Sequence, residues 1–266
     1  MRRIIDQHPP GAFCWIELST TNQNAAKSFY GSLFGWTPRD FPMGPNDFYT
    51  MFQLEERNAG AAYTMRPEQR SQGVPPHWMM YIAVANVDDA ASRAAQLGGK
   101  VVSPPCDVYD IGRMAVVQDP TEAVFALWQS KANSGLGIAG VHGTLCWMDL
   151  NTPDPARAQE FYTGLFGWRF STGENDPFGY VHIANGKDFI GGITPAGFGD
   201  PNAPPHWLAY FCVSNCDETN AKSNELGGKT LLAPLAVEKV GRMAILADPQ
   251  GAVFAVMGRE DAASAG

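Results

Sequence analysis

The sequence predicts an α+β protein made of four βαβββ modules, and internal repetition is the main reason. Residues 12–36 and 144–168 share 11 of 25 positions at an offset of 132. Residues 75–128 and 204–257 share 24 of 54 positions at an offset of 129. Two long blocks that recur in the same order indicate a tandem duplication, and 266 residues are enough for two domains of ordinary size.

We place the first domain at residues 1–130 and the second at 141–266, with a linker between them. The linker, residues 131–140, reads KANSGLGIAG. Its small residues and glycines are typical of a flexible connection. Just after it, His142 stands where the first half has Pro10, and we assign this histidine to a loop.

Each domain contains a weaker repeat of its own, because two of its segments follow the same order of elements. From Trp15, the alternating stretch WIELSTTN predicts a strand, and AAKSFYGSLFGW predicts a helix capped by Thr21 or Asn22. MMYIAVANV then predicts a buried strand, and AASRAAQLGG predicts a helix that ends at its two glycines. Three short strands are expected after each helix, at residues 36–41, 48–54 and 59–65, and at 100–107, 112–118 and 124–128.

Composition and charge argue against several classes of function. The chain is 45% hydrophobic and 17% charged, which is enough for packed cores, and no apolar run is long enough to span a bilayer. A net charge of −8 without a basic stripe argues against nucleic acid as a partner. The N-terminal MRRIIDQHPPG lacks the apolar segment of a signal peptide. The cysteines form no CxxC pair and indicate reduced thiols in a cytoplasmic protein; they are Cys14, Cys106, Cys146, Cys212 and Cys216.

Two motifs carry a resemblance to a known family. FYGSLFGW at 29–36 and FYTGLFGW at 161–168 each follow a capped helix start, and the two halves close on DPTEAVFALW and DPQGAVFAVM. With these motifs the chain resembles the vicinal oxygen chelate superfamily of glyoxalases, bleomycin resistance proteins and extradiol dioxygenases. It is most similar to the two-domain subgroup related to a mycobacterial culture-filtrate antigen. The resemblance implies two tandem glyoxalase-like domains, each a cup of curved mixed sheet with a divalent metal at its base.

The positions at which the family binds its metal hold unsuitable side chains in this sequence. The resemblance places the ligands on the first strand, on the strand before the second helix and on the last strand. These positions are Trp15, Met79 and Ala126 in the first half and Trp147, Leu208 and Ala255 in the second. Indole, thioether and methyl groups are poor ligands for a hard divalent cation. We therefore predict that the metal site is lost and that no cofactor is bound.

Two histidines and two acids remain as candidate catalytic residues. His77 and His206 recur in PPHW, and the period of two along a strand places them on the cup side. Glu17 and Asp149 lie two residues after the strand tryptophans and share that side. A histidine and a carboxylate in an apolar cup could exchange protons near neutral pH. Two alternatives stay open: a histidine that caps a loop, with an acid that pairs with a backbone group or an arginine, and a relocated metal site.

The candidate ligand-binding residues are those expected to face the cup: Trp15, Met79, Trp147, Leu208 and His182. Because the first half has Met51 in place of His182, the polar lining differs between the halves, which predicts one working cleft and one mainly structural cleft.

Several other residues have two interpretations. Arg113 and Arg242, repeated in GRM, could hold an anionic ligand or form salt bridges. Trp78 and Trp207 could line a pocket or fill the core. The residues assigned to the core are Trp36, Trp168, Phe34 and Phe166.

The sequence favours a metal-free binding protein that sequesters a small hydrophobic or aromatic compound. One alternative is a glyoxalase-like lyase, isomerase or hydroxylase that acts on a small carbonyl metabolite, and another is a protein-interaction role. The expected partner is a small-molecule ligand, with no nucleic acid and no membrane. Because the halves can pair internally, we expect a monomer with an internal pseudo-dimer, or a homodimer.

Overall fold

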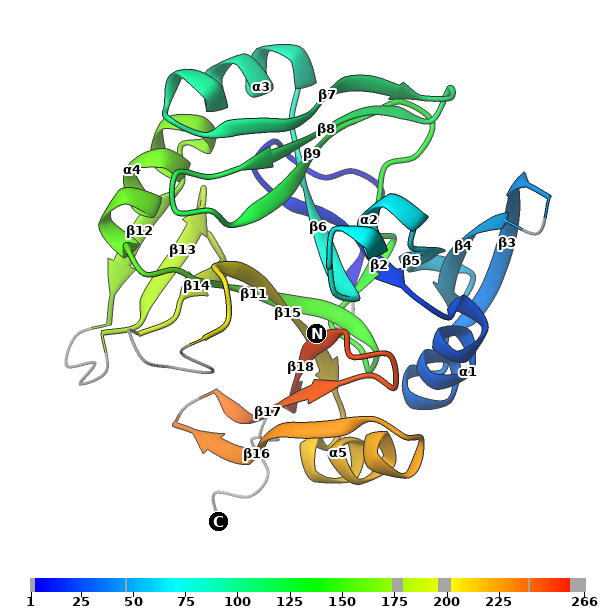
Figure 1. Cartoon of the computed structure of the whole chain (residues 1–266). Helices are drawn as coiled ribbons and strands as arrows, with labels where there is room; N and C mark the ends of the chain where they lie inside the picture. Colours follow the sequence, from blue (N-terminus) through cyan, green and yellow to red (C-terminus); the bar gives the residue numbers. More distant parts are fainter. Residues whose placement is uncertain (1–2, 46, 174–178, 196–201, 239, 259–266) are drawn as a thin grey trace.

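The protein folds as two eight-stranded mixed sheets with few helices, as this computed structural model shows (Figure 1). The residues described are 3–45, 47–173, 179–195, 202–238 and 240–258. The main elements of the first half are β2 (Phe13–Thr20), α1 (Gln23–Phe34), β3 (Thr37–Gly44), β4 (Asp47–Leu54), β5 (Arg57–Thr64), α2 (Pro67–Ser71), β6 (His77–Ala83), α3 (Val87–Gln96), β7 (Lys100–Val108), β8 (Gly112–Gln118) and β9 (Val124–Ser130). Those of the second half are β11 (Thr144–Asn151), α4 (Pro155–Phe166), β12 (Arg169–Thr172), β13 (Val181–Asn185), β14 (Asp188–Ile193), β15 (His206–Val213), α5 (Cys216–Glu225), β16 (Lys229–Val237), β17 (Gly241–Ala247) and β18 (Val253–Gly258).

Each sheet joins two βαβββ modules side by side. The strand order is β3-β4-β5-β2-β6-β9-β8-β7 in the first sheet and β12-β13-β14-β11-β15-β18-β17-β16 in the second. The modules meet at their first strands, because β2 pairs antiparallel with β6, and β11 with β15. The predicted α+β fold of four modules in two tandem domains is confirmed. The short helix α2, which the sequence reading missed, precedes the second module.

Side-chain caps set the limits of the helices. Asn22 rather than Thr21 caps α1, since its side chain accepts a hydrogen bond from the Ala25 amide, and Gly35 ends the helix in the left-handed conformation. Asn86 caps α3, which leaves Asp88 in the first turn. Within the described residues, no helix combines the length and apolar character that crossing a bilayer requires.

The Gly-rich segment 131–140 packs against the first sheet, although its composition suggested a flexible connection. Within it β10 (Ile138–Ala139) pairs with β1 (Arg3–Ile4), and Leu136 and Ile138 are buried. A Cβ atom at Gly135 would overlap the Cys14 carbonyl, so glycine permits two backbones to approach closely here. The predicted domain limits, residues 130 and 141, stay a prediction.

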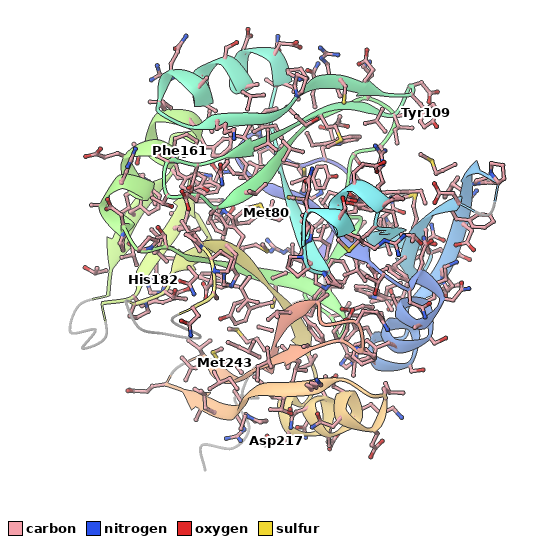
Figure 2. All side chains as sticks on the ribbon, in the orientation of Figure 1. Met80, Tyr109, Phe161, His182, Asp217 and Met243 are labelled. Atoms are coloured by element: carbon pink, nitrogen blue, oxygen red, sulfur yellow. The ribbon has the colours of Figure 1, made fainter. Side chains whose placement is uncertain are left out.

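The first sheet curves until its two outermost hairpins meet. The hydroxyl oxygen of Tyr109, at the tip of the β7–β8 hairpin, lies 3.9 Å from the sulfur of Met43 in the β3–β4 hairpin. Figure 2 shows Tyr109 directed towards that hairpin. These hairpins stand at opposite ends of the strand order. The sheet therefore has an inner face, which we define by Glu17 and Met79, and an outer face turned to the second half of the chain.

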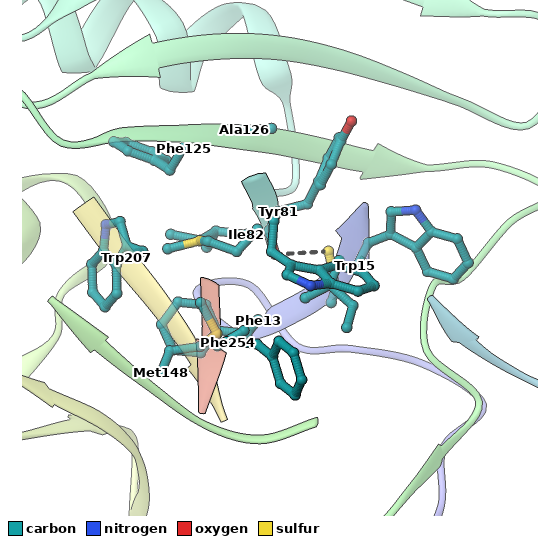
Figure 3. Close-up of a cluster of buried hydrophobic side chains, with 14 of the residues drawn as sticks. Phe13, Trp15, Tyr81, Ile82, Phe125, Ala126, Met148, Trp207 and Phe254 are labelled. Carbon is teal, nitrogen blue, oxygen red and sulfur yellow. Dashed lines mark hydrogen bonds between the residues drawn. The ribbon is translucent and has the colours of Figure 1, made fainter. Parts of the chain in front are cut away.

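The outer faces of the two sheets share one aromatic core. The first helix of each half packs across the chain, since α1 contacts α5, and α4 contacts α3. The indole of Trp36 donates to the Gly143 carbonyl at 2.8 Å, and that of Trp168 donates to the Gly11 carbonyl at 2.9 Å. Around Phe13 this core joins both halves, because its ring contacts Trp168 and Trp207 (Figure 3). The assignment of Trp36, Trp168 and Phe34 to the core is confirmed, whereas Phe166 is partly buried and packs against the core.

A pair of buried tyrosine–aspartate hydrogen bonds crosses this core. Tyr30 donates to Asp248 at 3.1 Å, and Tyr162 donates to Asp119 at 2.9 Å. Burial raises the pKa of both carboxyls, while these hydroxyls and nearby backbone amides oppose the shift.

The two tryptophans with an open assignment also belong to this core. Trp78 donates to the Tyr30 hydroxyl and Trp207 to the Tyr162 hydroxyl. Their interpretation as pocket walls is therefore wrong, because both indoles lie on the outer faces.

Replacing Tyr162 by Phe should destabilise the chain by about 1–3 kcal/mol, because the Asp119 carboxyl would lose a donor inside the core. Urea unfolding of the variant measures this change. Tyr109→Phe, at a tyrosine that is 72% exposed, is the matched control and should change stability by less than about 0.5 kcal/mol. An equal, small effect of both substitutions would contradict the bridging role.

Candidate functional site

The inner face of each sheet carries an acid at its centre. Across β2 and β6, Glu17 lies opposite Met79, and Trp15 lies opposite Tyr81. Across β11 and β15, the corresponding pairs are Asp149 with Leu208 and Trp147 with Tyr210. Opposed residues of an antiparallel pair share a face. The predicted placement of each acid beside the altered ligand position is therefore confirmed.

The first acid lies in a cluster of aromatic hydrogen-bond donors. Tyr81 donates to the Glu17 carboxyl at 3.1 Å, and Tyr49 of β4 donates to the same group. The Trp15 indole donates to the Tyr49 hydroxyl at 3.0 Å. Trp15 and Tyr81 are buried, whereas Glu17 and Tyr49 are half-buried. In Figure 3 the Tyr81 ring is directed away from Trp207 and Phe254, towards the inner face.

The second half repeats this cluster with equivalent residues. Tyr180 and Tyr210 both donate to the Asp149 carboxyl. The Trp147 indole lies 2.7 Å from the Tyr180 hydroxyl and 3.0 Å from Asp149 Oδ1. Asp149 is only 4% exposed. We call the two sets the acid–tyrosine clusters: Trp15, Glu17, Tyr49 and Tyr81 in the first half, and Trp147, Asp149, Tyr180 and Tyr210 in the second.

Burial shifts the titration of both clusters in one direction. It raises the pKa of Glu17 and of Asp149, although the tyrosine hydroxyls oppose the shift by hydrogen-bonding to the ionised form. Burial and the adjacent carboxyl also raise the pKa of Tyr49, Tyr81 and their counterparts. The tyrosines therefore remain donors, and each acid is moved towards the pH range in which it can exchange a proton.

The two PPHW histidines lie apart from these acids. His77 stands opposite Ser19 and donates through Nδ1 to the Pro75 carbonyl at 2.8 Å. His206 makes the same bond to the Pro204 carbonyl. The proposed histidine–carboxylate pair is not formed among the described residues, because each imidazole caps the preceding loop. Tyrosines occupy the place expected for the histidines.

Of the predicted histidines, His182 packs against two members of the second acid–tyrosine cluster, Trp147 and Tyr180. Asp149, Gly192 and His182 stand in one row across β11, β14 and β13. The His182 ring, labelled in Figure 2, packs edge-on against the Tyr180 ring with 5.0 Å between the ring centroids. Burial raises the pKa of Asp149, and the electrostatic interaction with His182 opposes that shift. The corresponding row of the first half is Glu17, Ala61 and Met51.

Apolar side chains surround the second cluster. Leu208 belongs to a set of inner-face residues separate from the shared core. The buried members of this set are Leu208, Tyr210, Met243, Ile245 and Ala255, and the partly buried ones are Cys146, Trp147, Leu232, Leu235, Val237 and Met257.

The side chains at the family's metal positions do not fit a divalent ion. The Trp15 indole is a donor and is already bonded to Tyr49, and Ala126 has no ligand atom. Met79 offers a thioether, which is a soft ligand. In the described part of the chain, no group of three or more His, Cys, Asp or Glu side chains is placed to hold a metal.

The repeated arginines form salt bridges to α3 in the first half and to α5 in the second. Arg113 makes a two-pronged contact with Asp88 at 2.8 Å, and Arg242 makes the same contact with Asp217 at 2.7 and 2.8 Å. The acids stand in the first turns of α3 and α5. Arg113 and Arg242 therefore form salt bridges, which is the second of the two roles considered for them.

The tyrosines of the clusters are the residues that sequence reasoning missed. Tyr49 and Tyr180 lie in the loop-rich stretch between the two repeated blocks, where the offset is 131. Tyr81 and Tyr210 lie inside the second block at the offset of 129. A search for polar residues retained at equivalent positions would have found all four.

Replacing Gly192 by Ala should break the second cluster, because a Cβ atom there would overlap the Tyr180 phenol. We expect a loss of about 1–3 kcal/mol in unfolding free energy, measured in urea. Tyr180→Phe should then cost little more in the Gly192→Ala background, giving a coupling of about 1 kcal/mol or more. Tyr49→Phe in the first half is the control, and its cost in unfolding free energy should be the same with or without Gly192→Ala. Additive costs of Gly192→Ala and Tyr180→Phe would contradict this geometry.

Comparison with known proteins agrees with the fold and the repeat. The sequence model of the glyoxalase/bleomycin resistance protein/dioxygenase superfamily matches residues 13–127. Among solved structures, the Mn(II)-bound glyoxalase from Novosphingobium aromaticivorans superimposes with a TM-score of 0.66 at 15% identity, covering 97% of this chain and 83% of that one. The 2,3-dioxygenase LapB from Pseudomonas sp. KL28 gives 0.64 at 13% identity, covering 94% of each chain.

Two relatives match almost the whole chain in sequence. CFP32 of Mycobacterium tuberculosis, a candidate glyoxylase by name, is 39% identical over 249 residues, which are 91% of this chain and 93% of that protein. The anthracycline biosynthesis protein DauV of a Streptomyces species is 32% identical over 265 residues, which are 93% of each. The chain therefore belongs to the glyoxalase/bleomycin resistance protein/dioxygenase superfamily.

Proposed function

We propose that the inner faces of this protein bind a small aromatic compound that carries a hydroxyl or carbonyl oxygen, and that binding requires no metal ion. The observation that carries the proposal is the acid–tyrosine cluster, which occurs in both halves with the same four residue roles. Glu17 is half-buried, so part of its carboxyl can still be reached from the inner face. A purely structural role would not require an acid at such a position.

The chemistry of the cluster suits a ligand oxygen. A tyrosine hydroxyl has one O–H, which could turn from the carboxyl to a carbonyl or phenolate oxygen of the ligand, and the carboxyl oxygen that it leaves could accept from a phenol. The surrounding side chains are apolar and aromatic, as is usual for sites that hold flat organic molecules. Few polar groups in an apolar setting fix the orientation of a ligand and leave its ring system to hydrophobic contact.

The name of one relative supports the proposal. DauV is named as an anthracycline biosynthesis protein. The altered metal positions favour binding without a metal, because Trp15, Met79 and their counterparts cannot replace the family's ligands. A cytoplasmic location and a monomeric or dimeric assembly stay predictions.

The binding proposal is tested by calorimetry with 2-naphthol, using protein treated with EDTA. We expect affinity to fall by about tenfold or more in Glu17→Gln combined with Asp149→Asn, since a neutral amide accepts a weaker hydrogen bond from a phenol than a carboxylate does. The single variants report which inner face contributes. Naphthalene, which lacks the oxygen, is the ligand control and should bind more weakly to the unmodified protein.

Glu122→Gln, an exposed acid outside both clusters, is the matched protein control and should leave affinity unchanged. Unchanged affinity in the double variant, or binding that appears only after metal is added, would overturn the proposal.

The second candidate function is catalysis of proton transfer next to a carbonyl group. The observation that favours it is the raised pKa of Glu17 and Asp149 beside tyrosine donors. The ionised acid would take a proton from the carbon next to the carbonyl, while a tyrosine hydroxyl would donate to the enolate oxygen. Return of the proton to the same carbon gives hydrogen exchange, and return to a different carbon of a conjugated enolate gives an isomer; neither needs a co-reactant.

This activity predicts deuterium exchange into 2-tetralone in D₂O, followed by NMR. Asp149→Asn should slow the exchange by about 10²-fold or more, because the amide cannot accept the proton. Glu122→Gln is again the control. A rate equal to that of the buffer alone would leave the protein as a binder only.

A further inference from the structure

A histidine ring fills a slot at one of the two junctions between the halves. His142 lies just before β11, and its Nε2 is 3.0 Å from the carbonyl oxygen of Leu33 at the end of α1. The amide of Ser214 donates to its Nδ1 at 3.3 Å. The ring of Phe34 packs edge-on against the imidazole, with 6.0 Å between the ring centroids. One carbonyl, one amide and one aromatic ring therefore hold the imidazole.

These partners select one form of the ring. A backbone carbonyl can only accept, so Nε2 carries the hydrogen, and a backbone amide can only donate, so Nδ1 carries the lone pair. The slot thus recognises a neutral five-membered ring with a donor and an acceptor separated by one carbon.

The other junction has the same backbone but a different residue. Pro10 stands where the second half has His142. The next residue, Gly11, has a φ of 81° and donates to the Ala83 carbonyl at 2.8 Å. Its counterpart Gly143 has a φ of 78° and donates to the Cys212 carbonyl at 2.8 Å. The backbone of the slot is therefore kept, and proline stands in place of the histidine.

A pocket of about 320 Å³ lies at this second junction. Three of its lining residues correspond to the partners of His142: Leu165 to Leu33, Phe166 to Phe34, and Ala85 to Ser214. Asp89 and Arg93 of α3 also line it.

Two polar groups at the second junction correspond to those that hold His142. Within the described residues, no hydrogen bond is found for the carbonyl of Leu165 or for the amide of Ala85. In the filled slot, the equivalent groups are the ones that bond to the imidazole.

We propose that the pocket between Pro10, Ala85, Leu165 and Phe166 is a binding site for a small molecule that carries an imidazole or a similar azole ring. The ring donates to the Leu165 carbonyl, accepts from the Ala85 amide and packs its edge against Phe166, as His142 does in the other half. The site lies at the junction of the halves and not on an inner face, so it is independent of the proposed aromatic ligand.

The test is a titration of the whole chain with imidazole at about pH 8.5, where the free ring is neutral, followed by ¹⁵N–¹H NMR. We expect a saturable shift of the Ala85 amide resonance. 1-Methylimidazole keeps the acceptor but has no N–H donor, and it should bind at least about tenfold more weakly.

Three variants make the test specific. Pro10→His places an imidazole in the slot from the chain itself and should abolish the response to imidazole. Pro10→Ala removes proline without filling the slot and should keep the response. His142→Ala opens the other slot, so imidazole should then also shift the Ser214 amide.

The proposal would be overturned by a linear, unsaturable shift at Ala85, by equal binding of 1-methylimidazole, or by a Pro10→His variant that responds as the unmodified chain does. Because these three readings do not involve His142→Ala, they stand even where that variant fails to fold.

Discussion

The packing of the first helix of each half against a helix of the other half is the constraint on which the rest of the structure depends. Because α1 packs on α5 and α4 on α3, the outer faces of both sheets are buried against each other in one aromatic core. The buried Tyr30–Asp248 and Tyr162–Asp119 hydrogen bonds fix the relative position of the halves, since a displaced donor would leave a carboxyl unsatisfied inside the core. The outer faces are thereby occupied by the shared core.

The fold was predictable from the sequence, and the reason is local. The signals that predict strands and helices, such as the period of two and the Asn22 cap, each depend on a few neighbouring residues. The duplication repeats these signals in the second half, so each element could be predicted twice. The segment 131–140 was misjudged because its glycines serve a close backbone approach, as at Gly135, which composition alone does not distinguish from flexibility.

The candidate site was predictable only in part. Strand period placed Glu17 on the correct face, but its partners come from β4 and β6, which are distant in sequence. The predicted histidine–acid pair does not form because His77 lies two residues along the strand from the Glu17–Met79 pair and its Nδ1 donates to the Pro75 carbonyl instead. Such choices depend on three-dimensional neighbours and not on spacing.

The two acid–tyrosine clusters share their framework and differ beside it. Gly192 leaves room for the Tyr180 ring over the sheet, whereas Ala61 occupies that place in the first half. His182 adds a titratable ring to the second cluster, where the first has Met51. Duplication has therefore kept the acid and its donors while the side chains around them diverged.

The tyrosine–aspartate hydrogen bonds also bear on the ancestry of the chain. The first repeat holds Tyr30 and Asp119, one from each of the two bridges, and the second holds Tyr162 and Asp248. Two separate copies of a single repeat could therefore satisfy each other around a true two-fold axis, with each tyrosine reaching the aspartate of its neighbour. The gene fusion would have turned an isologous homodimer into one polypeptide. It also freed the two halves to evolve apart, as Pro10 and His142 have done.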